Sequence, residues 1–155
     1  WAQRARSLQL GVKYVKWTFE PWKARNAFFN LEKLGAIISE LQENFYGVDY
    51  ATAATGGKEI GLASDRLFCE WHLESPKVLA LAAGEKYTEA GESARRITVT
   101  PDWSSLVAAD PEAALAEQTR LRAEFEAGFA EDLVCRGFVR DETAPQYLLF
   151  KKENA

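Results

Sequence analysis

The sequence predicts an α+β fold, in which a mixed sheet is followed by an extension made of a helix and a hairpin. Strand-like and helical runs alternate over the first 45 residues, and residues 66–73 form a clear strand. Asp110 and the proline after it then mark a strong helix start, with two strand-like runs beyond it. We expect residues 1–84 to form one unit and residues 85–155 an extension on the same sheet.

The first part of the chain reads as helix, strand, helix, strand. Residues 1–9 have apolar side chains at helical spacing, and residues 12–19 are rich in β-branched and aromatic types that favour a strand near the middle of a sheet. Residues 22–34 carry an apolar helical stripe and are followed by a glycine, which is typical of a helix end. Residues 36–45 are predicted to be a strand, so that the two strands and the helix between them make a crossover connection.

The middle of the chain contains the longest stretch without periodicity. Residues 46–64 are small and polar and are predicted to form a long loop, which in a compact domain is usually functional or mobile. The strand at 66–73 alternates apolar and other residues, and Ser75 with the following proline starts a short helix to about residue 83. Residues 84–93 are charged and contain glycine, which indicates a hinge or a surface excursion.

The last part of the chain predicts one long helix and three strands. Residues 95–100 are strand-like. Asp110 can cap the free amides of a helix that continues to about residue 132, with a buried stripe formed by Leu121, Phe125, Gly128 and Phe129. Residues 134–140 and 146–151 are expected to pair as a terminal hairpin.

Composition excludes several classes of protein. The chain has 155 residues, of which 47% are hydrophobic and 27% charged, so wholesale disorder is excluded. With 19 Lys and Arg against 23 Asp and Glu, the net charge is −4, and neither nucleic acid nor an anionic membrane is expected as a partner. No apolar run is long enough to cross a bilayer. The expected location is the cytoplasm.

The cysteines and the single histidine argue against a zinc site. Cys69 and Cys135 are far apart in the sequence and show no Cys-x-x-Cys spacing. His72 is the only histidine of the chain. Cys69 falls at an apolar position of its strand and is expected to behave as a small buried hydrophobe, which fits a reducing compartment. The chain contains no methionine and opens on Trp1, so we expect that residue 1 is not a natural translation start.

The predicted helix over residues 22–34 has a second, amide-bearing face. Asn26, Phe29, Asn30 and Lys33 are spaced i, i+3, i+4 and i+7, and their side chains could hydrogen-bond an extended ligand. Asparagines on a helix more often simply face solvent. The aromatic ring of Phe29 between them, which would otherwise be exposed, favours the ligand-binding interpretation.

The strand over residues 66–73 places Glu70 and His72 on one face, where they could act as an acid/base pair. The alternatives are an edge ion pair between this carboxylate and the histidine, a contact that positions a substrate, or a structural Glu70 that is paired with Arg66 or Arg95. A serine nucleophile is discounted, because no Gly-x-Ser-x-Gly elbow accompanies the nearby serines. The Gly56-Gly57-Lys58 run does not complete a phosphate-binding loop motif and indicates a flexible loop.

Three consecutive runs, residues 2–11, 12–21 and 25–36, carry a resemblance to a known family. They resemble, in order, the helix after the pyrophosphate loop, the splayed central strand, and the helix lining the coenzyme A channel in acetyltransferases of the GNAT superfamily. Shorter runs are similar to a group of larger predicted acetyltransferases; these are Trp-Thr-Phe-Glu-Pro, Arg-Asn-Ala-Phe-Phe-Asn, Leu-Gly-Ala, Phe-Tyr-Gly, Ser-Asp-Arg and Glu-Trp. The resemblance extends through about Val78 and more faintly through the last helix and strands.

The resemblance implies a partial GNAT-like acyl-CoA N-acyltransferase sheet and a function in acyl transfer. Acetyl-CoA would be the acyl donor and a small-molecule amine or similar nucleophile the acceptor. The resemblance implies cofactor contacts from the splayed strand, at Trp17 and Thr18, and from the channel helix, at Asn26, Phe29 and Asn30. A second copy of the chain as a partner is left open.

Three departures from the superfamily pattern weaken the catalytic interpretation. The superfamily's pyrophosphate loop would lie upstream of Trp1, so we expect this chain to be a fragment that binds coenzyme A weakly or not at all. The tyrosine that often serves as general acid corresponds to Leu31 here, and the asparagine is displaced by two positions. A degenerate member that binds a ligand or partner without catalysis is therefore the alternative function.

Overall fold

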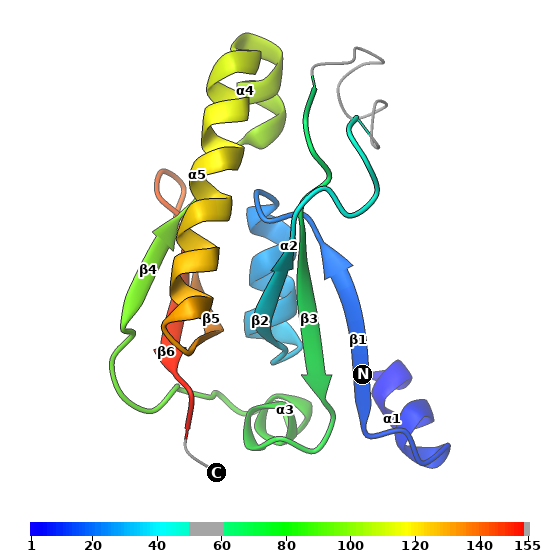
Figure 1. Cartoon of the computed structure of the whole chain (residues 1–155). Coiled ribbons are helices and arrows are strands. Elements are labelled where there is room, and N and C mark those ends of the chain that lie inside the picture. The colour runs from blue at the N-terminus through cyan, green and yellow to red at the C-terminus, as the bar shows by residue number, and fades with distance from the viewer. Residues whose placement is uncertain (50–60, 154–155) are drawn as a thin grey trace.

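A computed structural model describes residues 1–49 and 61–153 as one six-stranded sheet with helices packed on it. The strand order is β1-β3-β2-β5-β6-β4, and the strands are β1 (Tyr14–Phe19), β2 (Ile37–Gln42), β3 (Arg66–His72), β4 (Arg95–Thr98), β5 (Leu133–Val139) and β6 (Gln146–Lys151). The helices are α1 (Ala2–Gln9), α2 (Ala24–Phe28) with the π-helical turn η1 (Phe29–Lys33), α3 (Pro76–Ala82), α4 (Trp103–Ala109) and α5 (Pro111–Ala130). Figure 1 shows α5 lying across one face of the sheet, over β5 and β6, with α2 behind β2.

The α+β prediction is confirmed, but the prediction of a mixed sheet is wrong. The prediction that residues 12–19 lie near the middle of the sheet is also wrong, because β1 forms one edge of the described sheet. Every neighbouring pair of strands in the described sheet is antiparallel. β1 and β2 do run parallel to each other, as a crossover connection requires, because each is antiparallel to β3. Since β3 lies between them, the parallel strands are never neighbours. The sequence showed the crossover and gave no sign of the strand inserted into it.

The predicted extension continues the same sheet. β5 joins β2 through one register pair, Ile38 with Cys135, and the predicted hairpin of β5 and β6 is confirmed. The long helix begins where expected, with the Asp110 carboxylate accepting a hydrogen bond from the backbone N–H of Ala113 at 3.0 Å. Division of the chain between residues 84 and 85 stays a prediction.

The helix predicted over residues 22–34 forms, but it changes its winding halfway. α2 passes into the π-turn η1, where the N–H of Leu34 donates to the carbonyl of Phe29 at 3.0 Å, five residues back. Such widened turns are rare and occur often at functional sites. α4 was not predicted at all; it is capped by Asp102, and Trp103 at its start stacks on Trp22 with ring centroids 4.7 Å apart.

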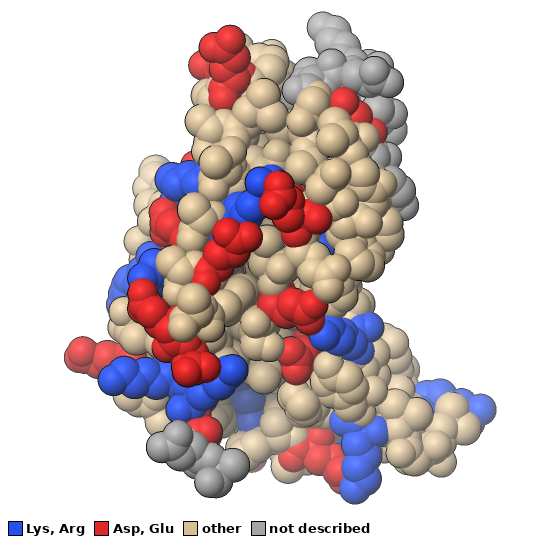
Figure 2. All heavy atoms as spheres, in the orientation of Figure 1, with Lys and Arg blue, Asp and Glu red and all other residues tan. Residues whose placement is uncertain are grey.

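Charged residues on the face drawn in Figure 2 are interspersed by sign over α5. Arg120, for example, pairs with Glu117 and Glu124 one turn to either side. None of the helices among the described residues combines the length and the apolar character needed to span a bilayer.

Gly35, which ends η1, cannot be replaced without strain. Its φ is +75°, and a Cβ built on it would lie 3.1–3.2 Å from side chains of α3. Gly84 has a similar φ of +78° with open space around it. We therefore expect Gly35→Ala to cost about 1–2 kcal/mol for the left-handed backbone and about 1–3 kcal/mol more for crowding, whereas Gly84→Ala costs only the first part. Urea denaturation of both variants measures the difference; equal losses would show that α3 yields freely.

Candidate functional site

The two faces of β3 divide as its alternation predicts. Leu67, Cys69 and Trp71 are buried, whereas Phe68 and Glu70 are half-buried and His72 is exposed. The buried face packs in the core, where the indole N–H of Trp71 donates to the carbonyl of Leu34 at 2.8 Å. The predicted acid/base pair therefore lies together on the open face of the sheet.

Glu70 is held by one hydroxyl and faces one imidazole. The Ser39 hydroxyl donates to Glu70 Oε1 at 2.6 Å, and His72 Nε2 lies 3.7 Å from Oε2. The Glu70 side chain is 19% exposed and that of His72 50% exposed, so solvent or a small solute can reach the pair. This carboxylate has no bond to a guanidinium and keeps one oxygen directed toward the imidazole.

The alternative in which Glu70 pairs with Arg66 or Arg95 is wrong. Arg66 Nη1 lies 3.8 Å from the carboxylate of Glu20, and Arg95 Nη2 lies 2.6 Å from that of Glu131. Arg66 starts β3 two pleats away from Glu70, and Arg95 belongs to the opposite edge of the sheet. Sequence distance alone could not exclude these partners, because the strand order was unknown.

Tyr14 of β1 completes the cluster and was missed by the sequence analysis. It lies opposite His72 in the strand register, with ring centroids 5.0 Å apart. Partial burial, followed by the negative charge of Glu70, raises the pKa of the Tyr14 hydroxyl above its ordinary value. The phenol therefore stays protonated at neutral pH and can act as a proton donor beside the carboxylate. We call Tyr14, Ser39, Glu70 and His72 the Glu70 cluster.

Ser39 reaches Glu70 because of an irregularity in β2. Ile37 pairs with Glu70 and Ile38 with Cys69, but Glu40 then pairs with Phe68, so the residue between them is bulged out of the register. Bulges re-aim side chains next to functional sites. The neighbouring Glu40 is already neutralised, because Lys16 Nζ lies 2.8 Å from its carboxylate. No pattern within residues 36–45 marks the bulge, since it arises from pairing with β3.

The residues predicted to contact a cofactor lie farther along β1 than Tyr14 and on the helix that follows β1. Trp17 is half-buried on the core face, edge-on to Trp71 at 6.0 Å, and Thr18 is the next residue of the same strand. Asn26 is exposed, Phe29 is 53% exposed and Asn30 is buried. Within residues 1–49 and 61–153, no hydrogen bond or ion pair joins these helix residues to Glu70 or His72.

Solvent therefore reaches Asn26, whereas Asn30 is buried. The prediction that the apolar stripe of this helix packs inward is confirmed. Ala27 and Leu31 are fully buried and Phe28 partly so. Leu31 cannot supply a proton and has no access to a ligand from its place in the core. A general acid, if the reaction uses one, must be supplied by another helix or strand.

The cysteines and Ser64, which are other potential nucleophiles, do not contribute to the Glu70 cluster. Burial raises the pKa of the Cys69 thiol far above its usual range and that of Cys135 to about 12, so both stay unreactive thiols. The Ser64 hydroxyl accepts a hydrogen bond from the N–H of Tyr46 at 2.7 Å. The described residues contain no group of three His, Cys, Asp or Glu side chains that could hold a metal ion. The Gly56-Gly57-Lys58 run and most of the predicted long loop lie outside the described residues.

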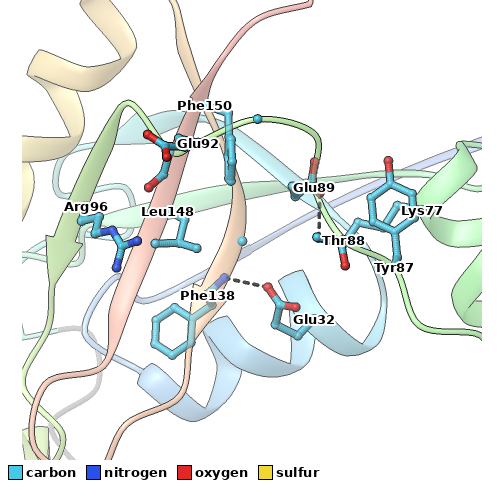
Figure 3. A pocket seen from close by; sticks show the side chains of 13 residues that line it. Glu32, Lys77, Tyr87, Thr88, Glu89, Glu92, Arg96, Phe138, Leu148 and Phe150 are labelled. Carbon is cyan, nitrogen blue, oxygen red and sulfur yellow. Dashed lines mark hydrogen bonds and ion pairs between the residues drawn. The ribbon is translucent and has the colours of Figure 1, made fainter.

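A hollow of about 650 Å³ opens on the sheet beside η1, and Figure 3 shows its polar groups. Glu32 reaches from η1 to β5, where its carboxylate accepts the N–H of Phe138 at 2.7 Å. Lys77 of α3 is buried and lies 3.0 Å from Glu89, in the segment that follows α3. These charged groups are occupied by hydrogen bonds and ion pairs within the protein, which hold the segment after α3 to the rest of the fold. The hollow is therefore a weaker candidate for chemistry than the Glu70 cluster.

Comparisons of the chain with protein-family models, with curated proteins and with solved structures found no match.

Proposed function

We propose that this protein transfers an acyl group from acetyl-CoA to an amine or similar nucleophile, with Glu70 as the general base. The observation that carries the proposal is the position of the Glu70 carboxylate. It is half-buried on an open sheet face, anchored through one oxygen by Ser39, and directed through the other toward His72. A positioned carboxylate with a free oxygen can take a proton from an ammonium group, directly or through one water.

The residues of the cluster divide the proton transfers among them. Glu70 attracts the ammonium form of the acceptor and removes one proton, which leaves a nucleophilic nitrogen. Acetyl-CoA supplies the acyl carbon, so that a C–N bond forms, the C–S bond breaks and coenzyme A leaves as a thiol. The thiol proton can come from Tyr14, whose pKa is raised above its ordinary value. Glu70 passes its first proton to water through the exposed His72, and the second proton of the nitrogen then returns to Tyr14 through Glu70. One proton is released to solvent in each turnover, and the cluster is restored.

The resemblance implies that β1 is a splayed central strand, but β1 lies at one edge of the described sheet. Among the described residues, β1 pairs with β3 on one side and has no strand on its other side. The backbone N–H groups along that edge, next to Trp17 and Thr18, suit the amide-bearing part of the cofactor and a developing oxyanion. Tyr14 belongs to the same strand. Acetyl-CoA bound along this edge would therefore lie close to the Glu70 cluster.

A second candidate function is ligand binding without catalysis. The observation that favours it is Leu31, which is apolar and fully buried where the superfamily often has its general-acid tyrosine. Retention of acetyl-CoA without turnover would distinguish this function from acyl transfer.

The test is an assay of thiol release with the protein in its natural full length. A panel of primary amines is supplied together with acetyl-CoA, and mass spectrometry identifies any acylated amine. We expect thiol release that depends on the amine, with equal amounts of thiol and amide. Binding of acetyl-CoA without release would select the second function. A folded protein that neither binds nor releases would overturn both.

A further inference from the structure

A separate hollow of about 580 Å³ lies between the helix of α2 and η1 and the turn that joins β5 to β6. Its floor is aromatic and its rim is cationic. We call it the Phe28 hollow and define it by Phe28, Phe29, Phe138, Arg25, Lys33 and Arg140. Its volume is within the range of ordinary small-molecule sites.

The three cations of the Phe28 hollow have no acidic partner. Among residues 1–49 and 61–153, no hydrogen bond or ion pair joins the side chain of Arg25, Lys33 or Arg140 to a carboxylate. The one acid of the lining, Asp141, is used by its own turn: its Oδ1 accepts from the N–H of Thr143 at 2.8 Å and from that of Ala144 at 2.7 Å. These hydrogen bonds lower the pKa of Asp141, so its carboxylate stays anionic while its Oδ1 is occupied by the turn.

The protein has more acidic than basic residues, and several of its cations are paired with carboxylates, as Lys16 is with Glu40 and Arg122 with Asp65. At the hollow, two cations approach the same ring instead: Lys33 Nζ lies 5.4 Å and the Arg140 guanidinium 5.6 Å from the centroid of Phe28. Like charges held near one ring repel each other, and an anion between them would remove that repulsion.

The floor of the hollow suits a flat ring. Phe29 is 53% exposed on a helix that is otherwise packed on the sheet, and Phe28 is partly exposed beside it. Phe138 closes the floor from β5 and is itself supported edge-on by Tyr147, with ring centroids 4.9 Å apart. Planar heteroaromatic rings stack on such side chains with little dependence on their substituents.

We propose that the Phe28 hollow binds a nucleotide-type ligand, namely a planar heteroaromatic ring that carries phosphate. The ring lies against Phe28 and Phe29, and the phosphate groups lie among Arg25, Lys33 and Arg140. Phosphate is favoured over a single carboxylate because three cations converge on one hollow and a guanidinium can bind two phosphate oxygens at once. The proposal uses no residue of the Glu70 cluster, shares only Phe29 with the acetyl-CoA contacts that the resemblance implies, and is tested separately from acyl transfer.

The test uses three probes that separate the ring from the charge: ADP, adenosine and pyrophosphate. Calorimetry with the unmodified protein should show ADP binding at least about tenfold tighter than either of the other two, because only ADP satisfies both the floor and the rim. Affinity for ADP should fall as salt is added. The absence of saturable ADP binding up to about 1 mM would overturn the proposal.

Variants of the rim and floor locate the site. Arg140→Gln and Lys33→Gln should each weaken ADP binding about tenfold, whereas Lys151→Gln, which removes an exposed cation on β6, should not change it. Phe29→Ala should weaken ADP but leave pyrophosphate unaffected, since it removes only the ring contact. These side chains are largely exposed, so folding is checked by melting temperature. Variants of normal melting temperature that bind ADP as well as Lys151→Gln would overturn the assignment.

Discussion

Glu70→Gln should lower the turnover of acyl transfer by about a hundredfold or more while leaving the affinity for acetyl-CoA nearly unchanged. The amide oxygen of glutamine can still accept the hydrogen bond that Ser39 donates, so the fold around β3 should persist. The amide cannot take a proton from an ammonium group, and the loss falls on the chemical step. Single-turnover rates and melting temperature, measured on the same preparation, report the two effects separately.

Glu40→Gln is the matched control for this experiment. Glu40 is a carboxylate on the neighbouring strand, but Lys16 already neutralises it at 2.8 Å, and Lys16 together with Gln42 lowers the pKa of that carboxyl. Its loss should leave single turnover nearly unchanged. If Glu70 is structural instead, Glu70→Gln lowers the melting temperature and leaves turnover per folded molecule intact. That outcome would remove Glu70 from the chemistry.

Asp65→Ala should destabilise the fold by about 3–5 kcal/mol, which for a chain of this length lowers the melting temperature by roughly 10 °C. Asp65 is 1% exposed and ties α5 to the start of β3: Arg122 Nε donates to Oδ2 at 2.9 Å and Nη2 to Oδ1 at 3.1 Å. The N–H of Asn44 donates to the same carboxylate at 3.0 Å. Without Asp65, the partly buried Arg122 guanidinium keeps only the carboxylate of Glu43, 2.7 Å from its Nη1, and the N–H of Asn44 loses its acceptor.

Glu74→Ala is the control for this loss, because it breaks an ion pair with Lys13 that is exposed to solvent. Exposed pairs contribute little, so the melting temperature should hardly move. The double variant Asp65→Leu, Arg122→Met should recover part of the loss of Asp65→Ala, since both buried charges are then absent. Thermal denaturation followed by circular dichroism measures all three. An effect of Asp65→Ala no larger than that of Glu74→Ala would show that the pair does not join α5 to the sheet.

Local patterns were sufficient to predict most of the elements. The alternation in residues 66–73 identified the buried face of β3, because side chains of a strand point to opposite sides whatever the strand pairs with. The Asp110 cap located the start of α5 for a similar reason, since its partner, the N–H of Ala113, is three residues away. α4 was missed because its position is stabilised by the stacking of Trp103 on Trp22, which is far away in sequence.

The sequence by itself determined the α+β class, the order of the elements other than α4 and the proximity of Glu70 to His72, because all of these follow from contacts within a few residues. Only the tertiary structure decided that β3 lies between β1 and β2, which brings Tyr14 and the bulged Ser39 to Glu70. It also brought Arg140 to the ring of Phe28, a residue more than a hundred positions earlier. Strand order and register depend on which distant apolar faces bury each other, and no short stretch of sequence carries that information.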